Sequence, residues 1–211
     1  MIGLVLGLAA VPVYAGLSGD SYAMTLCSRI LVFALAALGL NLALGYGGMV
    51  SLGHAMYMGL GAYAVLLLPD FGVQSGWLQL LLIALVVTVV ASLVGWVALR
   101  TQGIAFIMIT LAFAQLFYFL FVSLKAYGGD EGMSLSQASG FGPLTGNRTA
   151  LYYSLLACLG ATAFGIHRVV GSRFGLVLRA SKANERRVKA VGTPTLPYRL
   201  VAYVLSALVC A

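Results

Sequence analysis

The chain has 211 residues, of which 62% are hydrophobic and only 8% are charged. Soluble domains carry about 25% charged residues, so this composition excludes a water-soluble globular domain, and its high hydrophobicity excludes intrinsic disorder. The formal net charge of +7 does not indicate nucleic-acid binding, because in a membrane protein the distribution of charge matters more than its sum. The sequence therefore predicts an all-α fold, a polytopic bundle of transmembrane helices.

Apolar runs long enough to cross a bilayer follow one another along the chain. A transmembrane helix needs about 20 mainly apolar residues. The first run has no preceding basic residue and no clear cleavage site, so we interpret it as a span and not as a signal peptide. We expect six complete spans near 2–17, 26–46, 55–69, 78–99, 104–124 and 150–167, and a seventh that begins near Leu200.

The last apolar run, from Leu200 to Ala211, is too short to cross a bilayer alone. We therefore expect residues 1–211 to be a single transmembrane domain that is incomplete, cut within its seventh helix.

The basic residues predict the orientation of the chain, because cytoplasmic loops carry an excess of Lys and Arg. Most of the basic residues lie in the segment 168–199, which we place in the cytoplasm. Counting back through the spans then places the N-terminus in the cytoplasm as well. The acidic residues expected on the outer side are Asp20, Asp70, Asp130 and Glu131.

The segment 38–63, with the sequence LGLNLALGYGGMVSLGHAMYMGLGAY, is unusually rich in glycine. Glycine costs about 1 kcal/mol relative to alanine in a helix interior, so the segment is either an interrupted helix that lines a path or a close helix–helix contact. Both interpretations stay open. Asn41, Ser51 and His54 are its polar residues, and they either hydrogen-bond between helices or face the path. Gln115, in the fifth run, is a further candidate of this kind.

Motifs for enzymatic or metal chemistry are absent from the sequence. It contains no Walker A motif, no Gly-x-Ser-x-Gly elbow and no His-Glu-x-x-His motif. Cys27, Cys158 and Cys210 lie far apart in apolar surroundings and indicate neither a disulfide framework nor a zinc site. We expect no enzymatic activity, no metal and no cofactor.

The segment Ser172 to Arg199 is basic and has a helical pattern from about residue 176 to 191. Gly192 and the prolines at positions 194 and 197 end this predicted helix. The segment is an ordinary positive-inside loop, an amphipathic lipid-binding helix or a helix that docks on a cytoplasmic partner.

Three blocks of the sequence resemble the permeases of branched-chain amino-acid ABC transporters, the LivM-like family. They are the segment 38–63, the run LRTQGIAFIMITLAFAQLFYF followed by GGDEGM, and the run SRFGLVLRASKANERRVKAVG followed by YRLVAYVLSA. The resemblance implies a transport subunit in a bacterial inner (plasma) membrane. It would work with a second related permease, two cytoplasmic ATPase subunits and a periplasmic or extracellular binding protein that delivers leucine, isoleucine or valine.

The resemblance also implies roles for two groups of residues. The segment 168–199 would contain the loop that couples the permease to the ATPases, at Ala183, Asn184, Glu185, Arg186 and Gly192. The candidate residues of the solute path are Asn41, Tyr46, Gly47, Gly48, Ser51, His54 and Gln115.

Two alternatives remain at this point. In the first, the chain is a permease whose solute is urea, a short amide or another amino acid. In the second, the chain is a non-transporting scaffold whose basic loop binds membrane lipid or a cytosolic partner. A scaffold would need no solute and no ATPase.

Overall fold

The structure is a computed structural model that describes residue 12 and residues 21–73, 75–124 and 148–211. These residues form helices and no strands, which confirms the all-α prediction for the part of the chain that is described. The elements in chain order are α2 (Ser21–Asn41), the π-helix η1 (Leu42–Tyr46), α3 (Ala55–Leu67), the 3-10 helix η2 (Leu68–Phe71), α4 (Gly76–Ala98), α5 (Ile104–Ser123), α7 (Arg148–Gly171), α8 (Arg173–Ala190) and α9 (Thr195–Cys210).

Four described helices are long and apolar enough to cross a membrane: Met24–Tyr46, Gly76–Ala98, Ile104–Ser123 and Thr149–Gly171. They correspond to four of the predicted spans. The predicted span 55–69 and the predicted seventh span are represented by shorter apolar helices, Ala55–Phe71 and Thr195–Cys210. The predicted span 2–17 lies outside the described residues, apart from residue 12. The described part of the chain therefore has fewer membrane-length helices than the sequence predicts.

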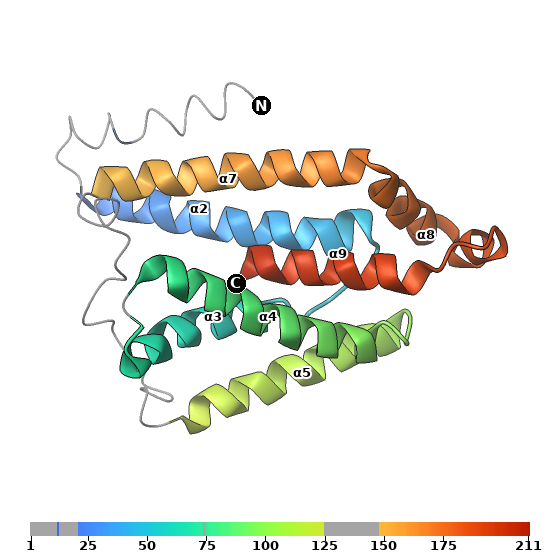
Figure 1. Cartoon of the computed structure of the whole chain (residues 1–211), viewed down its shortest axis with the longest axis horizontal. Coiled ribbons are helices and arrows are strands. Elements are labelled where there is room, and N and C mark those ends of the chain that lie inside the picture. Colours follow the sequence, from blue (N-terminus) through green and yellow to red (C-terminus); the bar gives the residue numbers. More distant parts are fainter. Residues whose placement is uncertain (1–11, 13–20, 74, 125–147) are drawn as a thin grey trace.

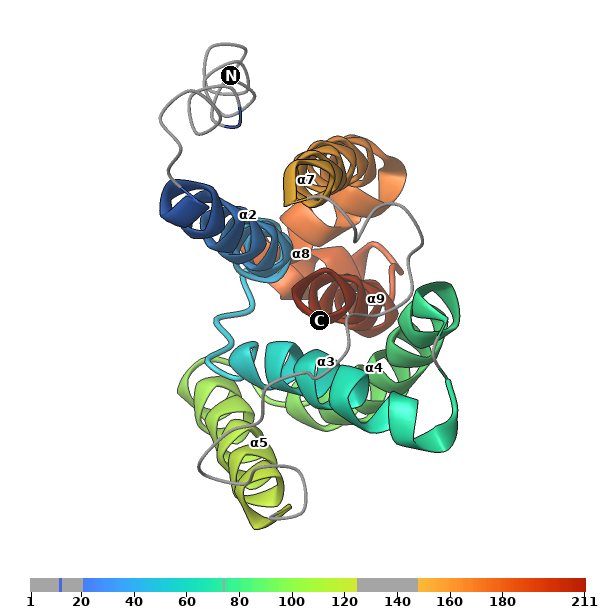
Figure 2. The same ribbon diagram turned by 90° about the vertical axis from the view of Figure 1, so that its left-hand side faces the viewer.

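Helix α9 lies at the centre of the described bundle. It contacts α2 on one side and α4 on the other, and α7 packs on the outside of α2. Figure 2, which looks along the helices, shows α9 between the pair α2 and α7 and the layer formed by α3, α4 and α5. Helix α8 lies at one end of the bundle, beside the end of α2 and the start of α9 (Figure 1). We refer to this end of the bundle as the α8 end.

Small side chains allow α4 to pack closely on α9. A Cβ added at Gly95 would lie 2.9 Å from the ring of Tyr203, so the ring occupies the space that a side chain would fill. The buried residues of α4 recur at helical spacing and include Val87, Ala91, Val94 and Ala98. This contact places Tyr203 and its neighbours in the interior, where they meet the glycine-rich segment.

Candidate functional site

The glycine-rich segment interrupts the helices that flank it. Helix α2 passes into the π-helix η1, and residues 47–54 that follow are not in a regular helix before α3 begins at Ala55. Gly48 has a φ of +66°, a left-handed conformation that glycine adopts without steric cost. The segment is therefore a broken helix, as one of the two interpretations predicts. We refer to residues 47–54 as the break.

The break reaches the interior of the bundle. The Nε2 atom of His54, at the end of the break, lies 2.8 Å from Oγ of Ser206. Ser206 is 11 residues beyond Thr195, the first residue of α9, or about 16 Å along the helix axis at 1.5 Å per residue. This is close to half of the ~30 Å hydrocarbon thickness.

Buried and exposed residues alternate along the break, as in an extended strand. Met49 and Ser51 are buried, whereas Val50 and Leu52 are 44% and 56% exposed. Within the described part of the chain, nothing accepts a hydrogen bond from the backbone N–H of Val50 or Leu52. Free backbone groups at membrane depth are expected only against protein or a water-filled cavity.

Two other glycines in the region allow close packing, as the second interpretation predicts. A Cβ at Gly53 would lie 2.6 Å from the backbone oxygen of Thr110 in α5, and one at Gly39 would lie 2.9 Å from the backbone oxygen of Ser206 in α9. Both distances are too short for a side chain. Interruption and close packing therefore occur together, at different glycines.

A chain of hydrogen bonds links the break to α9 and α2. The hydroxyl of Ser206 donates to the backbone oxygen of Gly39 at 2.6 Å, so its single proton is used there and its oxygen accepts from Nε2–H of His54 at 2.8 Å. The other ring nitrogen, Nδ1, is buried and has no partner among the residues that the structure describes. His54 thus has an interhelical role, and it retains one free acceptor in the interior.

Aromatic side chains surround His54. Its ring centroid lies 5.8 Å from that of Tyr57 and 5.3 Å from that of Tyr203, both edge-on. The hydroxyl of Tyr57 donates to that of Tyr203 at 3.2 Å. Sequence reasoning missed Tyr203 and Ser206. Their spacing of three residues, which places them on one face of a helix, was the only signal that pointed to them.

The predicted path residues do not form one cluster. Ser51, Gly47 and His54 are buried, and Gly48 is exposed at the break. Asn41 is exposed next to η1, Tyr46 is half-buried, and Gln115 is exposed on α5. The structure therefore brings together the residues of the break, while Gln115 has no hydrogen-bond partner among the described residues.

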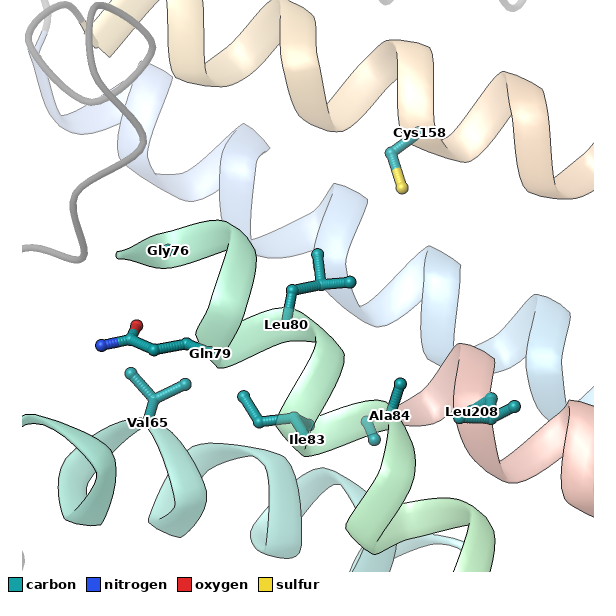
Figure 3. A pocket seen from close by; sticks show the side chains of 9 residues that line it. Val65, Gly76, Gln79, Leu80, Ile83, Ala84, Cys158 and Leu208 are labelled. Atoms are coloured by element: carbon teal, nitrogen blue, oxygen red, sulfur yellow. The ribbon is translucent and has the colours of Figure 1, made fainter. Parts of the chain in front are cut away.

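A pocket of about 380 Å³ lies between α3, α4, α7 and α9. Figure 3 shows Leu80, Ile83 and Leu208 on its wall and Cys158 on α7. Gln79 contributes the one buried oxygen without a partner on this wall, Oε1, while its nitrogen donates to the backbone oxygen of Val73 at 2.7 Å. The pocket is otherwise apolar, and it is separate from the residues of the break.

Helix α8 is not continuous, unlike the helix that the sequence predicts for residues 176–191. Asn184 has extended backbone angles, with φ −159° and ψ 97°. Its Oδ1 accepts from the backbone N–H of Arg187 at 3.1 Å, which caps a second short helix as asparagine commonly does. Gly192, with a φ of +85°, ends this second helix, as the sequence predicts.

The carboxylate of Glu185 is turned inward, and it ties α8 to two other parts of the bundle. It accepts from Nε2 of Gln102 at 2.6 Å, from Thr195 at 2.9 Å and from Arg199 at 3.0 Å, and Lys189 lies at 2.8 Å. We call these five residues the Glu185 cluster. The other predicted coupling residues, Ala183, Asn184, Arg186 and Gly192, are exposed.

The charged partners set the pKa of Glu185. Partial burial raises this pKa, but hydrogen bonds from Lys189 and Thr195 and the charges of Arg199 and Lys189 outweigh the effect, so the pKa lies below its ordinary value. A carboxylate with a lowered pKa stabilises the folded state above its unfolded pKa of about 4.3, and this stabilisation is lost as the pH falls through the lowered value.

We therefore expect acidification to remove the contribution of Glu185. The melting temperature of the wild-type protein in detergent should exceed that of Glu185→Gln at pH 7, and the difference should shrink steadily below about pH 4.3. Thermal unfolding of both proteins across this range measures it. A difference that is constant with pH would contradict the lowered pKa.

A second contact joins α8 to η1, directly before the break. Nζ of Lys182 donates to the backbone oxygen of Gly45, in η1, at 2.7 Å. The residues around this contact line a polar hollow of about 250 Å³ at the α8 end, and they include Gly47, Gly48, Lys182, Glu185 and Arg199.

Comparisons with known proteins identify the family of the chain. Residues 22–211 match the family model described as "Branched-chain amino acid transport system / permease component". The chain is 24% identical over 203 residues to the high-affinity branched-chain amino acid transport system permease protein LivM of Escherichia coli (strain K12), covering 84% of this chain and 48% of that protein. It is 23% identical over 207 residues to the LivM protein of Salmonella typhimurium (strain LT2), covering 86% of this chain and 49% of that protein.

The chain thus spans about half the length of the curated relatives it matches. No solved structure matches the chain. The family match covers every described helix from α3 onward and almost all of α2, and the chain belongs to the family of branched-chain amino acid transport system permease components.

Proposed function

We propose that the chain is the membrane permease subunit of an ATP-binding cassette importer for leucine, isoleucine and valine. It lies in the bacterial inner membrane with its N-terminus in the cytoplasm and about six complete spans. The family and the names of the two relatives support this proposal.

The broken helix is the observation that carries the proposal. Val50 and Leu52 have exposed apolar side chains there, and their backbone N–H groups have no hydrogen-bond partner among the described residues. A branched-chain amino acid has the complementary chemistry, since it combines an apolar side chain with a carboxylate that accepts hydrogen bonds. Transporters use unwound backbone of this kind near the membrane midplane.

The proposed partners follow from the same family. They are a second related permease, two cytoplasmic ATPase subunits and a periplasmic or extracellular amino-acid-binding protein. ATP hydrolysis then belongs to separate chains, and the sequence here has no Walker A motif. The exposed end of α8, with Arg186 and Arg187 on its surface, would face the ATPases.

Uptake by the full-length protein tests the solute path. We expect Leu52→Trp to lower the uptake of radiolabelled leucine by at least about tenfold, because the larger ring would fill the path. A tenfold loss corresponds to an increase of about 1.4 kcal/mol in the activation free energy of transport. Leu85→Trp is the matched control, since Leu85 on α4 is also 56% exposed. Normal uptake by Leu52→Trp would contradict the placement of the path.

Partners and solute class are tested separately. A pull-down of the full-length protein from mild detergent should recover two ATPases and a second permease, and unlabelled valine and isoleucine should compete with leucine for uptake. Competition by urea or a short amide instead would change the solute class. Reproducible recovery of the protein alone would favour a scaffold.

A further inference from the structure

The residues that join α8 to the break have a consequence for coupling that depends on the function proposed above. Lys182 is the described side chain of α8 that hydrogen-bonds to η1, through Nζ and the backbone oxygen of Gly45. Its aliphatic stem also lies over the break, since a Cβ at Gly48 would be 2.7 Å from Cγ of Lys182. One side chain thus contacts both η1 and the break.

The hydrogen bonds of η1, which Lys182 contacts, differ from those of an α-helix. In the structure, the backbone N–H of Gly47 bonds to the oxygen of Leu42 at 3.2 Å, and the oxygen of Ala43 accepts from the N–H of Met49 at 3.0 Å. In an uninterrupted α-helix, the oxygen of Ala43 would accept from Gly47 instead. Single π-helical turns are rare and occur frequently at functional sites, and a change of partner at Ala43 would lengthen or shorten the helix at the start of the break.

The charge of Lys182 favours the arrangement that is observed. The end of a helix carries a partial negative charge on its free carbonyl groups, and a cation there is stabilising. Removing the cation or shifting α8 would withdraw this contact from η1.

The position of Lys182 on α8 connects it to the surface. Lys182 comes two residues before Asn184, where α8 breaks, and Glu185 then fixes the second part of α8 to Gln102 and to α9. A displacement of the exposed part of α8 is therefore transmitted along two routes. One leads through the Glu185 cluster to the α4–α5 connection and to α9, and the other leads through Lys182 to η1 and the break.

We infer that Lys182 is a positioning residue that links the movement of α8 to the opening of the break. It acts through the backbone oxygen of Gly45 and touches no solute. When a cytoplasmic partner shifts α8, the contact with Gly45 moves or breaks, η1 changes its hydrogen-bond arrangement, and the exposed side of residues 48–52 is repositioned.

The test compares Lys182→Met with Lys182→Arg and with Arg173→Met, in the full-length protein assembled with its ATPases in lipid vesicles. Methionine keeps the apolar stem and removes the donor, and arginine keeps both a stem and a donor. Arg173 is the matched control, because it is an exposed cation on the same helix without a hydrogen bond or an ion pair to any described residue. The quantities measured are leucine uptake, ATP hydrolysis and their ratio.

We expect Lys182→Met to lower uptake at least about tenfold while ATP hydrolysis stays within about twofold, so that more ATP is used for each leucine. Lys182→Arg should restore the ratio, and Arg173→Met should match the wild-type protein. An unchanged ratio in Lys182→Met overturns the inference. Absence of leucine uptake in the wild-type protein overturns the proposed function itself, and this inference with it.

A second readout does not depend on turnover. Leu52→Cys, with Cys27, Cys158 and Cys210 replaced by serine, is labelled by a thiol reagent in the presence and absence of ATP with vanadate. We expect nucleotide to change the labelling rate severalfold with Lys182 present, and to have no effect with Lys182→Met. The same nucleotide response in both proteins overturns the inference, even if Lys182→Met is expressed too poorly for uptake measurements.

Discussion

Replacing Glu185 with lysine is expected to destabilise the α8 end of the protein by about 3 kcal/mol or more. The change removes a carboxylate that binds Gln102, Thr195 and Arg199 and places a cation in its position. The side chains of Glu185 and Arg199 are only 18% and 12% exposed, and loss of one partner from a largely buried ion pair costs about 3–5 kcal/mol. The apparent melting temperature in detergent should fall by about 6 °C or more.

Charge reversal at the neighbouring position is the matched control. Arg186 is exposed and has no hydrogen bond or ion pair within the described part of the chain, so Arg186→Glu should change stability by no more than about 0.5 kcal/mol. A melting temperature of Glu185→Lys equal to that of the wild-type protein would show that the carboxylate does not hold α8 in place. Its importance would then lie at a partner surface.

Replacing Gly53 with leucine is expected to have the second large effect. A Cβ at this position would lie 2.6 Å from the backbone oxygen of Thr110, and a backbone atom cannot rotate away as a side chain can. The break and α5 would have to separate, which displaces Ser51 and His54 from their positions. Overpacking of this kind costs about 1–3 kcal/mol, and we expect leucine uptake to fall below detection.

Gly160→Leu in α7 is the control for this substitution. A Cβ at Gly160 meets nothing within 4 Å, and leucine has a higher helix propensity than glycine by almost 1 kcal/mol. This variant should keep its uptake and its melting temperature. Wild-type uptake by Gly53→Leu would mean that the close contact between the break and α5 is not needed for transport.

The sequence predicts the long helices well, because each is an apolar run whose length alone indicates a span. The membrane-length stretches Met24–Tyr46, Gly76–Ala98, Ile104–Ser123 and Thr149–Gly171 lie within a few residues of their predicted bounds. The break was predictable as one of two alternatives, because several glycines in a short segment are unfavourable in a helix. The sequence could not assign a role to each glycine, since that role depends on what lies opposite. Gly53 faces the backbone of Thr110, and Gly48 faces Lys182.

The contacts of α8 show where sequence reasoning stops. Glu185 lies in a basic, polar segment, a pattern that favours an exposed position on a partner-binding loop. Its carboxylate instead points inward, because the turn after Gly192 returns Thr195 and Arg199 to it and the α4–α5 connection brings Gln102 beside it. Gln102 is 83 residues away in the chain, and no local pattern encodes such a contact. Its role in coupling to an ATPase remains a proposal.

The central position of α9 also has a consequence for biosynthesis. His54 is synthesised 152 residues before Ser206. At translation rates of about 5–20 residues per second, Ser206 therefore follows about 8–30 s later. During that interval His54 and Tyr57 have no partner from α9 within the bilayer. The contacts that α9 makes with α2 and α4 can therefore form only after those helices have been synthesised, so the packing at the centre of the bundle is completed last.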